Sequence, residues 1–283
     1  MSRNPIPQNS VGVGLRAQHY RDAISNPKAV DWFEVHSENY FRQGGAPHFY
    51  LNKVRQDHPI SFHGVGLSLG STDPLNLSHL TRLKELVDIY QPTLVSEHLS
   101  WSSVDGVYLH DLLPLPMTEE SQSHLAGRIG QVQDFLGRQI LIENASTYLE
   151  FSQSQIPEWE FICEISNRSG CRILCDVNNV YVNSRNHRFS ATEFIEAVDP
   201  DLVGEIHLSG HTVKQLAEGE IRIDTHDQRV CDEVWELYRL AVRRFRHAPT
   251  LIEWDKNLPD YSVLLDEANT ARSLLSESTH ALA

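Results

Sequence analysis

Eight short apolar runs recur along the chain, and longer segments with helical periodicity separate them. The runs are VGVGLR (11–16), WFEVHSEN (32–39), ISFHGVGLS (60–68), TLVSEHLSW (93–101), ILIENAS (140–146), RILCDVNNV (172–180), LVGEIHLSG (202–210) and PTLIEWD (249–255). Helical periodicity is strongest at residues 77–92, 118–137 and 232–246, and the second of these has cap residues at Thr118 and Gly137. Such alternation is typical of βα units around a parallel sheet. With no Gly/Ser linker in sight, we predict one α/β domain over residues 1–283, a (β/α)8 or TIM barrel.

Composition narrows what such a barrel could bind. The formal net charge is −14, whereas binding to nucleic acid normally depends on Lys and Arg that neutralise phosphates. No apolar run approaches the ~20 residues that span a bilayer, and the N-terminus has no hydrophobic signal segment. We therefore expect a cytoplasmic protein without nucleic-acid or membrane partners. The four cysteines show no CxxC spacing, while there are 15 histidines, so any metal site should use nitrogen and oxygen ligands that suit iron, manganese or zinc.

Polar side chains occupy the expected ends of seven consecutive strands, from the second to the eighth. They are Glu38, His63, His98, Glu143, Asp176, His207 and Glu253. Barrel enzymes build their active sites at this C-terminal face of the strands. Unpaired carboxylates buried there would be costly, and bound cations would neutralise them directly. Asp224 and His226 lie in the long segment 211–228 and are placed to complete a metal shell from above. The segment 101–116 is also longer than a βα unit needs.

Several assignments stay open on the residues alone. Glu38 fits a general base or a substrate-binding group as well as a metal ligand. His36 lies one pleat deeper on the same face, where we expect it to pack or to support a ligand. Glu97 and His98 are adjacent, so only one can point straight into the barrel, and we favour the imidazole. His211 fits a metal ligand or a loop residue that binds substrate. Asparagines that can orient carboxylates or contact substrate follow the candidate ligands at Asn39, Asn144, Asn178 and Asn179.

Nine collinear motifs together resemble the multinuclear non-haem iron-dependent oxidases, a family that includes the oxidase of methanobactin biosynthesis. The motifs are FEVHSENYF, SFHGVGLSLG, SEHLSW, DLLPLP, ILIENAS, CDVNNVYVN, EIHLSGH, DTHD and LIEWD. The resemblance extends in order from about residue 11 to about residue 275, and so covers nearly the whole chain.

The resemblance implies a TIM barrel that holds two or three irons and uses dioxygen. Characterised members modify cysteine residues of ribosomally made precursor peptides, often with a separate partner protein that presents the peptide. The members make different products from cysteine, so the product is not implied. We expect Glu38, Asn179 and His211 to act beside the metal in catalysis. Carried over by motif, the implied iron ligands are His63, His98, Glu143, Asp176, His207, Asp224, His226 and Glu253.

Two other classes of function fit the same residues. A sugar isomerase, or a phosphodiesterase of the endonuclease IV type, would place His, Glu and Asp on the same kind of barrel, and fold alone does not decide between them. The acidic charge argues against the DNA enzyme. A non-catalytic protein of metal homeostasis is the third possibility. Redox-active iron would favour the oxidase, whereas tightly held zinc or manganese would favour hydrolysis or isomerisation.

Overall fold

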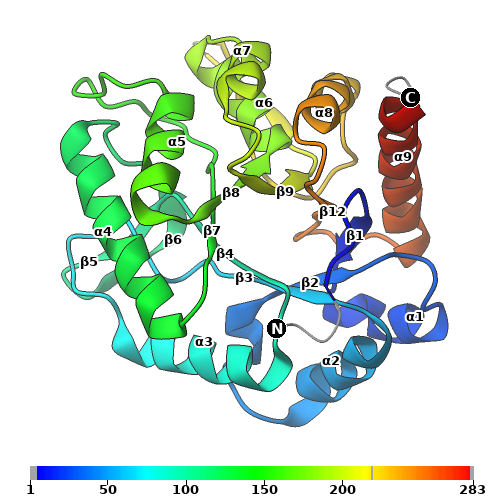
Figure 1. The fold of residues 1–283 in the computed structure, drawn as a ribbon. Coiled ribbons are helices and arrows are strands. Elements are labelled where there is room, and N and C mark those ends of the chain that lie inside the picture. Colours follow the sequence, from blue (N-terminus) through cyan, green and yellow to red (C-terminus); the bar gives the residue numbers. More distant parts are fainter. Residues whose placement is uncertain (1–4, 218, 281–283) are drawn as a thin grey trace.

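The computed structural model describes residues 5–217 and 219–280. Its barrel strands are β1 (Val11–Gly14), β2 (Phe33–His36), β3 (Ile60–His63), β4 (Leu94–His98), β7 (Leu141–Glu143), β8 (Arg172–Asp176), β9 (Val203–Leu208) and β12 (Thr250–Ile252). They close into a parallel ring in the order β1, β12, β9, β8, β7, β4, β3, β2 (Figure 1). Each strand lies within one of the eight apolar runs, and the predicted TIM barrel is confirmed.

Helices surround the ring (Figure 1). They are η1 (Ala17–His19), α1 (Tyr20–Ser25), η2 (Ser37–Tyr40), α2 (Gly45–Asp57), α3 (Leu77–Tyr90), α4 (Glu119–Leu136), α5 (Glu158–Ser169), α6 (Val177–His187), α7 (Ala191–Ala197), α8 (Asp232–Arg244) and α9 (Tyr261–His280). The three helices expected from periodicity are α3, α4 and α8. At the predicted caps of α4, the Thr118 hydroxyl accepts the amide hydrogen of Ser121, and Gly137 takes a left-handed conformation with φ of 70°. None of the described helices combines the length and apolar content that a membrane span requires.

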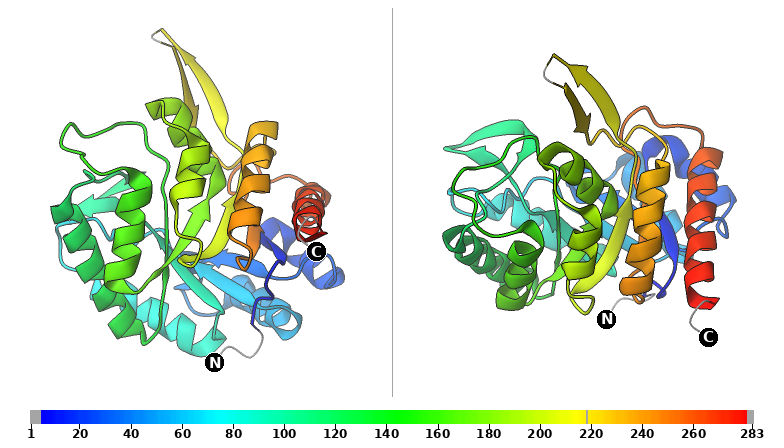
Figure 2. Two further views of the ribbon diagram at one scale, coloured as in Figure 1. Left: turned by 45° about the horizontal axis from the view of Figure 1, so that its top comes forward. Right: turned by 90° about the horizontal axis from the view of Figure 1, so that it is seen from above.

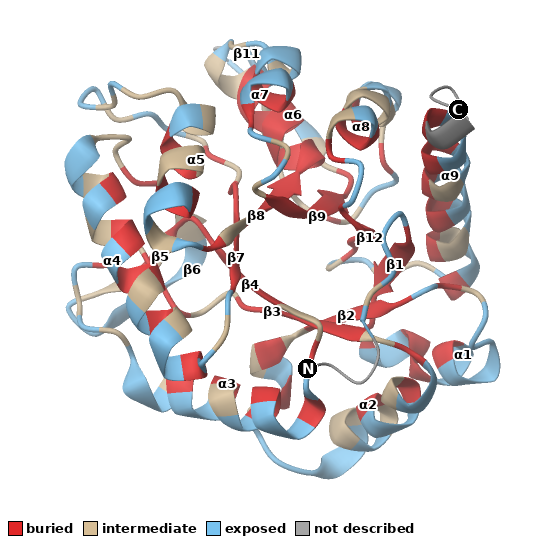
Figure 3. Ribbon diagram, viewed as in Figure 1, coloured by how far each residue is buried: buried red, intermediate tan, exposed pale blue. Residues whose placement is uncertain are grey.

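Most residues of the barrel strands are buried (Figure 3), so that consecutive side chains, which point to opposite faces, are both shielded from solvent. Helices cover the outward side chains, and the inward side chains meet one another across the ring. All six residues of β9 are buried, including the ionisable Glu205 and His207. The interior of this barrel therefore holds charged groups at positions where aliphatic side chains are usual.

Antiparallel hairpins occupy the two long segments. In the first, β5 (Trp101–Val104) pairs with β6 (Val107–Leu113) across an Asp105–Gly106 turn whose two φ angles are positive, as a tight two-residue hairpin requires. In the second, β10 (Thr212–Leu216) pairs with β11 (Gly219–Ile223). Figure 2 shows β10 and β11 standing clear of the barrel. Both segments follow strand ends, and so they flank the mouth where the candidate site lies.

Candidate metal centre

The strand register sets the candidate ligands side by side at the mouth. His98 at the end of β4 is opposite Glu143 at the end of β7, and Asp176 at the end of β8 is opposite His207 of β9. The second pairing depends on a register shift in the ladder between β8 and β9, which leaves Gly204 without an opposite residue. Such bulges re-aim side chains next to active sites.

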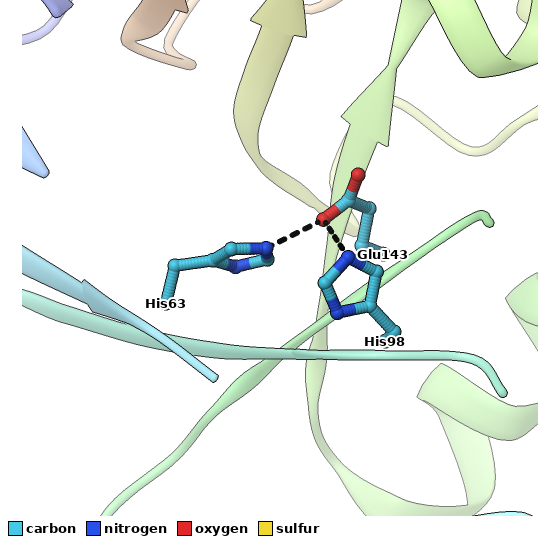
Figure 4. A group of neighbouring side chains, drawn as sticks. All are labelled: His63, His98 and Glu143. Carbon is cyan, nitrogen blue, oxygen red and sulfur yellow. Dashed lines mark ion pairs between the residues drawn. The ribbon is translucent and has the colours of Figure 1, made fainter. Parts of the chain in front are cut away.

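One group of three donors forms around Glu143 (Figure 4). Its Oε2 atom lies 3.2 Å from Nε2 of His63 and 3.4 Å from Nε2 of His98. The other ring nitrogen of each histidine is engaged, at 2.7 Å from the Ser96 hydroxyl and 3.0 Å from the Gly64 carbonyl. A carbonyl only accepts, so Nδ1 of His98 carries the hydrogen and Nε2 is left to bind a cation.

A second group shares the same glutamate. The ligand atoms of Glu143, Asp176, His207 and Glu253 all lie within 4.8 Å of one another, and all four residues are buried. Neither Oε2 of Glu143 nor Oδ2 of Asp176 has a hydrogen-bond partner among the described residues. Buried polar atoms are rarely left unpaired, and a bound ion would satisfy both of these oxygens. Because Glu143 belongs to both groups, its carboxylate could bridge two ions.

A third cluster lies around Glu253 on the outer side of the mouth. Asp224 approaches His226 at 2.7 Å, and Nδ1 of His226 lies 3.3 Å from Asp255. His36, Glu253 and Asp255 form another group with ligand atoms within 4.8 Å. The structure thus brings Asp224 and His226 to the mouth, and it adds His36 and Asp255 to the possible ligands. Asp255 lies two residues after Glu253, and side chains two apart in an extended chain point to the same side, so the sequence could have predicted its place beside Glu253.

Arg16 adds a fixed positive charge to this outer cluster. It follows β1, is 8% exposed, and its guanidinium lies 2.5 Å from Asp255, 3.1 Å from His36 and 4.0 Å from Glu253. Sequence reasoning missed this residue because it searched the strand ends for ligands, and arginine cannot bind a metal ion. Its charge offsets part of the negative charge at the mouth.

Glu38 takes a different environment from the other strand-end residues. Its Oε1 atom accepts hydrogen bonds of 2.9 Å from the backbone amides of both Val65 and Gly66, and lies 3.5 Å from Nε2 of His79. Glu38 is outside the three groups around the mouth and belongs to a separate group with His79 and Glu97.

Asn179 and His211 lie close to the centre in different ways. Asn179 lines the mouth, and its side-chain amide donates to Oε1 of Glu143 at 3.4 Å. His211 is one residue further out, since its Nδ1 lies 2.9 Å from the Asn178 oxygen while the Asn178 amide donates to Asp224 at 2.8 Å. Asn179 can therefore orient the Glu143 carboxylate, and His211 can reach Asp224 through Asn178.

The mouth forms a pocket of about 160 Å³. Candidate ligands from all three clusters line it, together with Leu112 of β6 and Thr225, which follows β11. Both hairpins therefore lead into its wall. Asp176 and His207 are not among the residues that line it.

Burial and neighbouring charged groups shift the pKa values at the mouth. Burial raises the pKa of Glu143 to about 8. Burial and the charge of Asp224 raise the pKa of Asp176 to about 7. Burial opposes the charged form of His98, but the carboxylate of Glu143 raises its pKa to about 10. The mouth thus retains protons that a bound cation would displace.

Comparison with known proteins identifies the family. Residues 10–276 match the family described as "RiPP precursor modification enzyme MbnB/TglH/ChrH". The chain belongs to this family of RiPP precursor modification enzymes. It is 48% identical to a UPF0276 protein of Vibrio parahaemolyticus over 269 residues, 95% of this chain and 93% of the relative. It is 46% identical to one of Acaryochloris marina over 266 residues, 94% of this chain and 95% of the relative. The family resemblance found in the motifs is confirmed.

Solved structures of similar shape are more distant in sequence. A xylose isomerase-like TIM barrel protein from Mycobacterium smegmatis in complex with magnesium has a TM-score of 0.62 and 13% identity, covering 95% of this chain and 97% of that one. Endonuclease IV from Thermus thermophilus has a TM-score of 0.60 and 12% identity, covering 95% and 99%. At such identities the likeness shows the fold alone.

Proposed function

We propose that this protein is a multinuclear non-haem iron oxidase that uses dioxygen to modify cysteine residues of a ribosomally synthesised precursor peptide. The observation that carries the proposal is the sharing of Glu143 between two groups of buried nitrogen and oxygen donors. A shared carboxylate would hold two ions at a fixed spacing within one pocket. Membership of a family that modifies precursor peptides supports a peptide as the substrate.

The donor set fits iron. Imidazoles and carboxylates suit iron among the transition metals, and the unpaired buried atoms of Glu143 and Asp176 face the place where ions would lie. Bound irons would supply the redox chemistry for oxidation of the peptide thiol by dioxygen. We assign the ligands to His63, His98, Glu143, Asp176, His207, Asp224, His226 and Glu253, with His36 and Asp255 as further candidates for a third ion.

The residues of the chain then have distinct tasks. The Ser96 hydroxyl and the Gly64 carbonyl hold the rings of His63 and His98 with Nε2 toward the centre. Asn179 orients Glu143 by donating to the oxygen that faces away from the two histidines. No cysteine lines the pocket in the described part of the chain, so a thiolate at the centre would come from the substrate.

A separate protein would present the peptide to this pocket, while the whole chain acts as one barrel domain. Apolar side chains on the hairpins support such a docking partner. Val107 and Tyr108 of β6 are each 59% exposed, and Leu216 of β10 is 54% exposed. Exposed apolar clusters beside a site often mark protein interaction surfaces.

Iron content and peptide oxidation test the proposal together. Protein purified without oxygen and reconstituted with Fe(II) should hold more than one iron per chain, because eight ligands exceed the roughly six positions of one octahedral ion. Adding dioxygen and a synthetic cysteine peptide, encoded by a short reading frame beside the gene, should consume oxygen and change the peptide mass. Glu143→Gln is the inactive control. A single tightly bound zinc with no uptake of iron would overturn the proposal.

A further inference from the structure

Two glutamates lie in the barrel interior directly below the metal centre. Glu34 of β2 precedes His36 by two residues, and Glu205 of β9 precedes His207 by two residues. Side chains two apart on a strand share a face, so both carboxyls point into the ring one layer deeper than the mouth. Both are 0% exposed. None of the tasks assigned to the proposed centre uses them.

The ring of His207 stands between these glutamates and the mouth. Its Nε2 atom lies 3.5 Å from Oε1 of Glu34 and 3.5 Å from Oε1 of Glu205. Its Nδ1 atom lies 3.1 Å from Oε2 of Glu253 at the mouth. The other oxygen of Glu34 accepts a hydrogen bond of 3.0 Å from Ser61. Both oxygens of Glu205, Oε1 of Glu34 and Nε2 of His207 lack a hydrogen-bond partner among the described residues.

We propose that Glu34 and Glu205 are positioning residues that hold the hydrogen of His207 on Nε2 and thereby turn the Nδ1 lone pair toward the metal. A neutral imidazole has one N–H and one lone pair, so a pair of acceptors on one side fixes which nitrogen is free on the other. At 3.5 Å both contacts are longer than a typical hydrogen bond, and Nε2 has no hydrogen-bond partner among the described residues. These two carboxylates are therefore the acceptors within reach of its hydrogen when Nδ1 turns from Glu253 to a metal ion. The inference rests on the metal centre of the proposed function, but not on iron, dioxygen or peptide.

The other two histidines of the centre show the same division of labour. His63 and His98 each have one nitrogen held by a protein group and the other nitrogen facing Glu143. Partners of this kind tune metal affinity because they fix the ring and raise its basicity. His207 differs in that its holding partners are carboxylates, which are the stronger acceptors.

A competing possibility is that Glu34, Glu205 and Nε2 of His207 themselves bind a further ion, since their ligand atoms also lie within 4.8 Å of one another. Two observations favour positioning. The Nδ1 atom of His207 already faces the mouth group. An additional ion at Nε2 would therefore require the ring to bind one metal ion through each nitrogen. Glu34 also has a hydroxyl donor in Ser61. Metal stoichiometry separates the two possibilities.

The test uses Glu34→Gln, Glu205→Gln and the double variant, titrated with Co(II) after removal of metal. Glutamine keeps the shape and an acceptor oxygen but removes the charge. We expect the number of Co(II) ions per chain to stay unchanged while one of them binds roughly 10- to 100-fold more weakly. In proton NMR of the Co(II) protein, an exchangeable shifted resonance from the His207 ring should be absent in His207→Ala and should move in the glutamine variants. Glu267→Gln is the matched control, a buried glutamate that accepts from Arg229 and the Val230 amide and belongs to none of the donor groups described above.

Two results would overturn the inference. Loss of one whole Co(II) equivalent in Glu34→Gln or Glu205→Gln would make these residues ligands. If the double variant bound Co(II) with unchanged affinity and its His207 ring resonance did not move, Glu34 and Glu205 would have no role in positioning a metal ligand. Circular dichroism of the metal-free variants checks their fold, and Glu205→Gln carries the test if Glu34→Gln does not fold. Because Co(II) binding needs neither dioxygen nor peptide, failure of the proposed oxidation would leave this measurement valid.

Discussion

Two clusters near the mouth contain the same kinds of side chain and differ in what satisfies them. The candidate metal cluster of His63, His98 and Glu143 and the neighbouring cluster of Glu38, His79 and Glu97 each bring three donor atoms within 4.8 Å of one another. Five of the six residues lie at or near the ends of barrel strands, and the sixth, His79, lies in the first turn of α3. From residue types and spacing alone, either cluster could be the site of an ion.

Hydrogen bonds distinguish the two clusters. Glu97 accepts the backbone amides of Leu67 at 2.7 Å and His98 at 2.8 Å, and Glu38 likewise accepts two backbone amides. Burial opposes the charged form of Glu97, but its hydrogen bonds with His98 and the Leu67 amide hold its pKa below the usual range. The equivalent oxygen of Glu143 has no such donor, and burial raises its pKa to about 8. A carboxylate that accepts hydrogen bonds from backbone amides, as Glu38 and Glu97 do, holds a loop in place. A buried carboxylate oxygen without a donor, as in Glu143, can bind a cation instead.

The largest effect that this comparison predicts is loss of metal from Glu143→Gln. One substitution removes the shared carboxylate, so both adjoining ions should bind more weakly, by more than the 10- to 100-fold that loss of an outer partner typically causes. Elemental analysis and chelator competition measure the change. Glu97→Gln is the paired control and should keep its full metal content. Equal metal loss in the two variants would break the distinction.

The pH dependence of stability should differ between metal-free and metal-bound protein. The pKa of Glu143 is raised from 4.5 to about 8, and that of Asp176 from 3.8 to about 7, both chiefly by burial. These two groups therefore bind more protons in the folded state than in the unfolded state between about pH 5 and pH 8, and their contribution to stability falls as pH rises through this window. His98 acts in the same direction, because its pKa is raised from 6.5 to about 10 and its contribution is lost above pH 6.5.

Urea unfolding of the chelated protein at pH 5, 6.5 and 8 checks this expectation, with a decrease on the order of a few kcal/mol. Saturation with Co(II) should reverse the trend, since ligands must lose their protons to bind. Glu143→Gln should flatten the metal-free curve. Stability of the metal-free protein that rises from pH 5 to pH 8 would contradict the assigned directions.

A smaller effect on stability is expected for a substitution in the neighbouring cluster. Glu97→Gln replaces an oxygen that accepts a backbone amide with an NH2 group, so one buried amide donor at Leu67 or His98 loses its partner. The free energy of unfolding should fall by about 1–3 kcal/mol at pH 7, as measured by urea denaturation in chelator. Glu38→Gln should cost less, because Oε1 alone accepts both backbone amides and the NH2 group can replace Oε2, whose partner, the Ser37 hydroxyl, can also accept a hydrogen bond. No change in Glu97→Gln would show that its hydrogen bonds do not stabilise the loop.

The barrel strands and most of the candidate ligands could be predicted from the sequence, whereas the different environments of the two clusters could not. Apolar runs placed the eight barrel strands because burial on both faces leaves a strong signal. Strand-end positions indicated His63, His98, Glu143, Asp176, His207 and Glu253, which the register then brings together. The sequence could not separate Glu38 from these, because the amides that satisfy it belong to the segment after β3 and their direction depends on the folded loop.

Two other features lay beyond sequence reasoning for different reasons. The hairpins β5–β6 and β10–β11 were expected only as long segments, although Asp105–Gly106 is a recognisable hairpin turn. Glu34 and Glu205 lie on the same strand faces as His36 and His207, so alternation could have found them. Their burial was not foreseen because charged residues inside a barrel contradict the usual aliphatic filling.

The smallest predicted effect concerns the segment that carries Asp224 and His226. Several hydrogen bonds hold it independently of any metal, among them the Asp224 amide to the Tyr148 hydroxyl at 3.1 Å, the His226 amide to the Gly210 carbonyl at 3.1 Å and the Asp255 amide to the His226 carbonyl at 2.8 Å. If these two side chains ligate an ion, chelation should speed hydrogen exchange at their amides and trypsin cleavage after Lys214. The rise should be less than about tenfold, or ~1.4 kcal/mol, because the contacts at the base of the hairpin remain.

Val65 and Gly66 provide the internal reference for this measurement. Their amides are held by Glu38 rather than by a metal, so their exchange should not change on chelation. His226→Ala should reproduce the faster exchange and cleavage in metal-bound protein, since it removes the ligand while leaving the reference amides in place. Equal exchange rates of the Asp224 amide with and without metal would mean that protein contacts alone hold this segment in place. The segment would then resemble the loop after β3, which Glu38 holds through hydrogen bonds to backbone amides. Asp224 and His226 would then no longer count as ligands, and the distinction between the two clusters would rest on His63, His98 and Glu143.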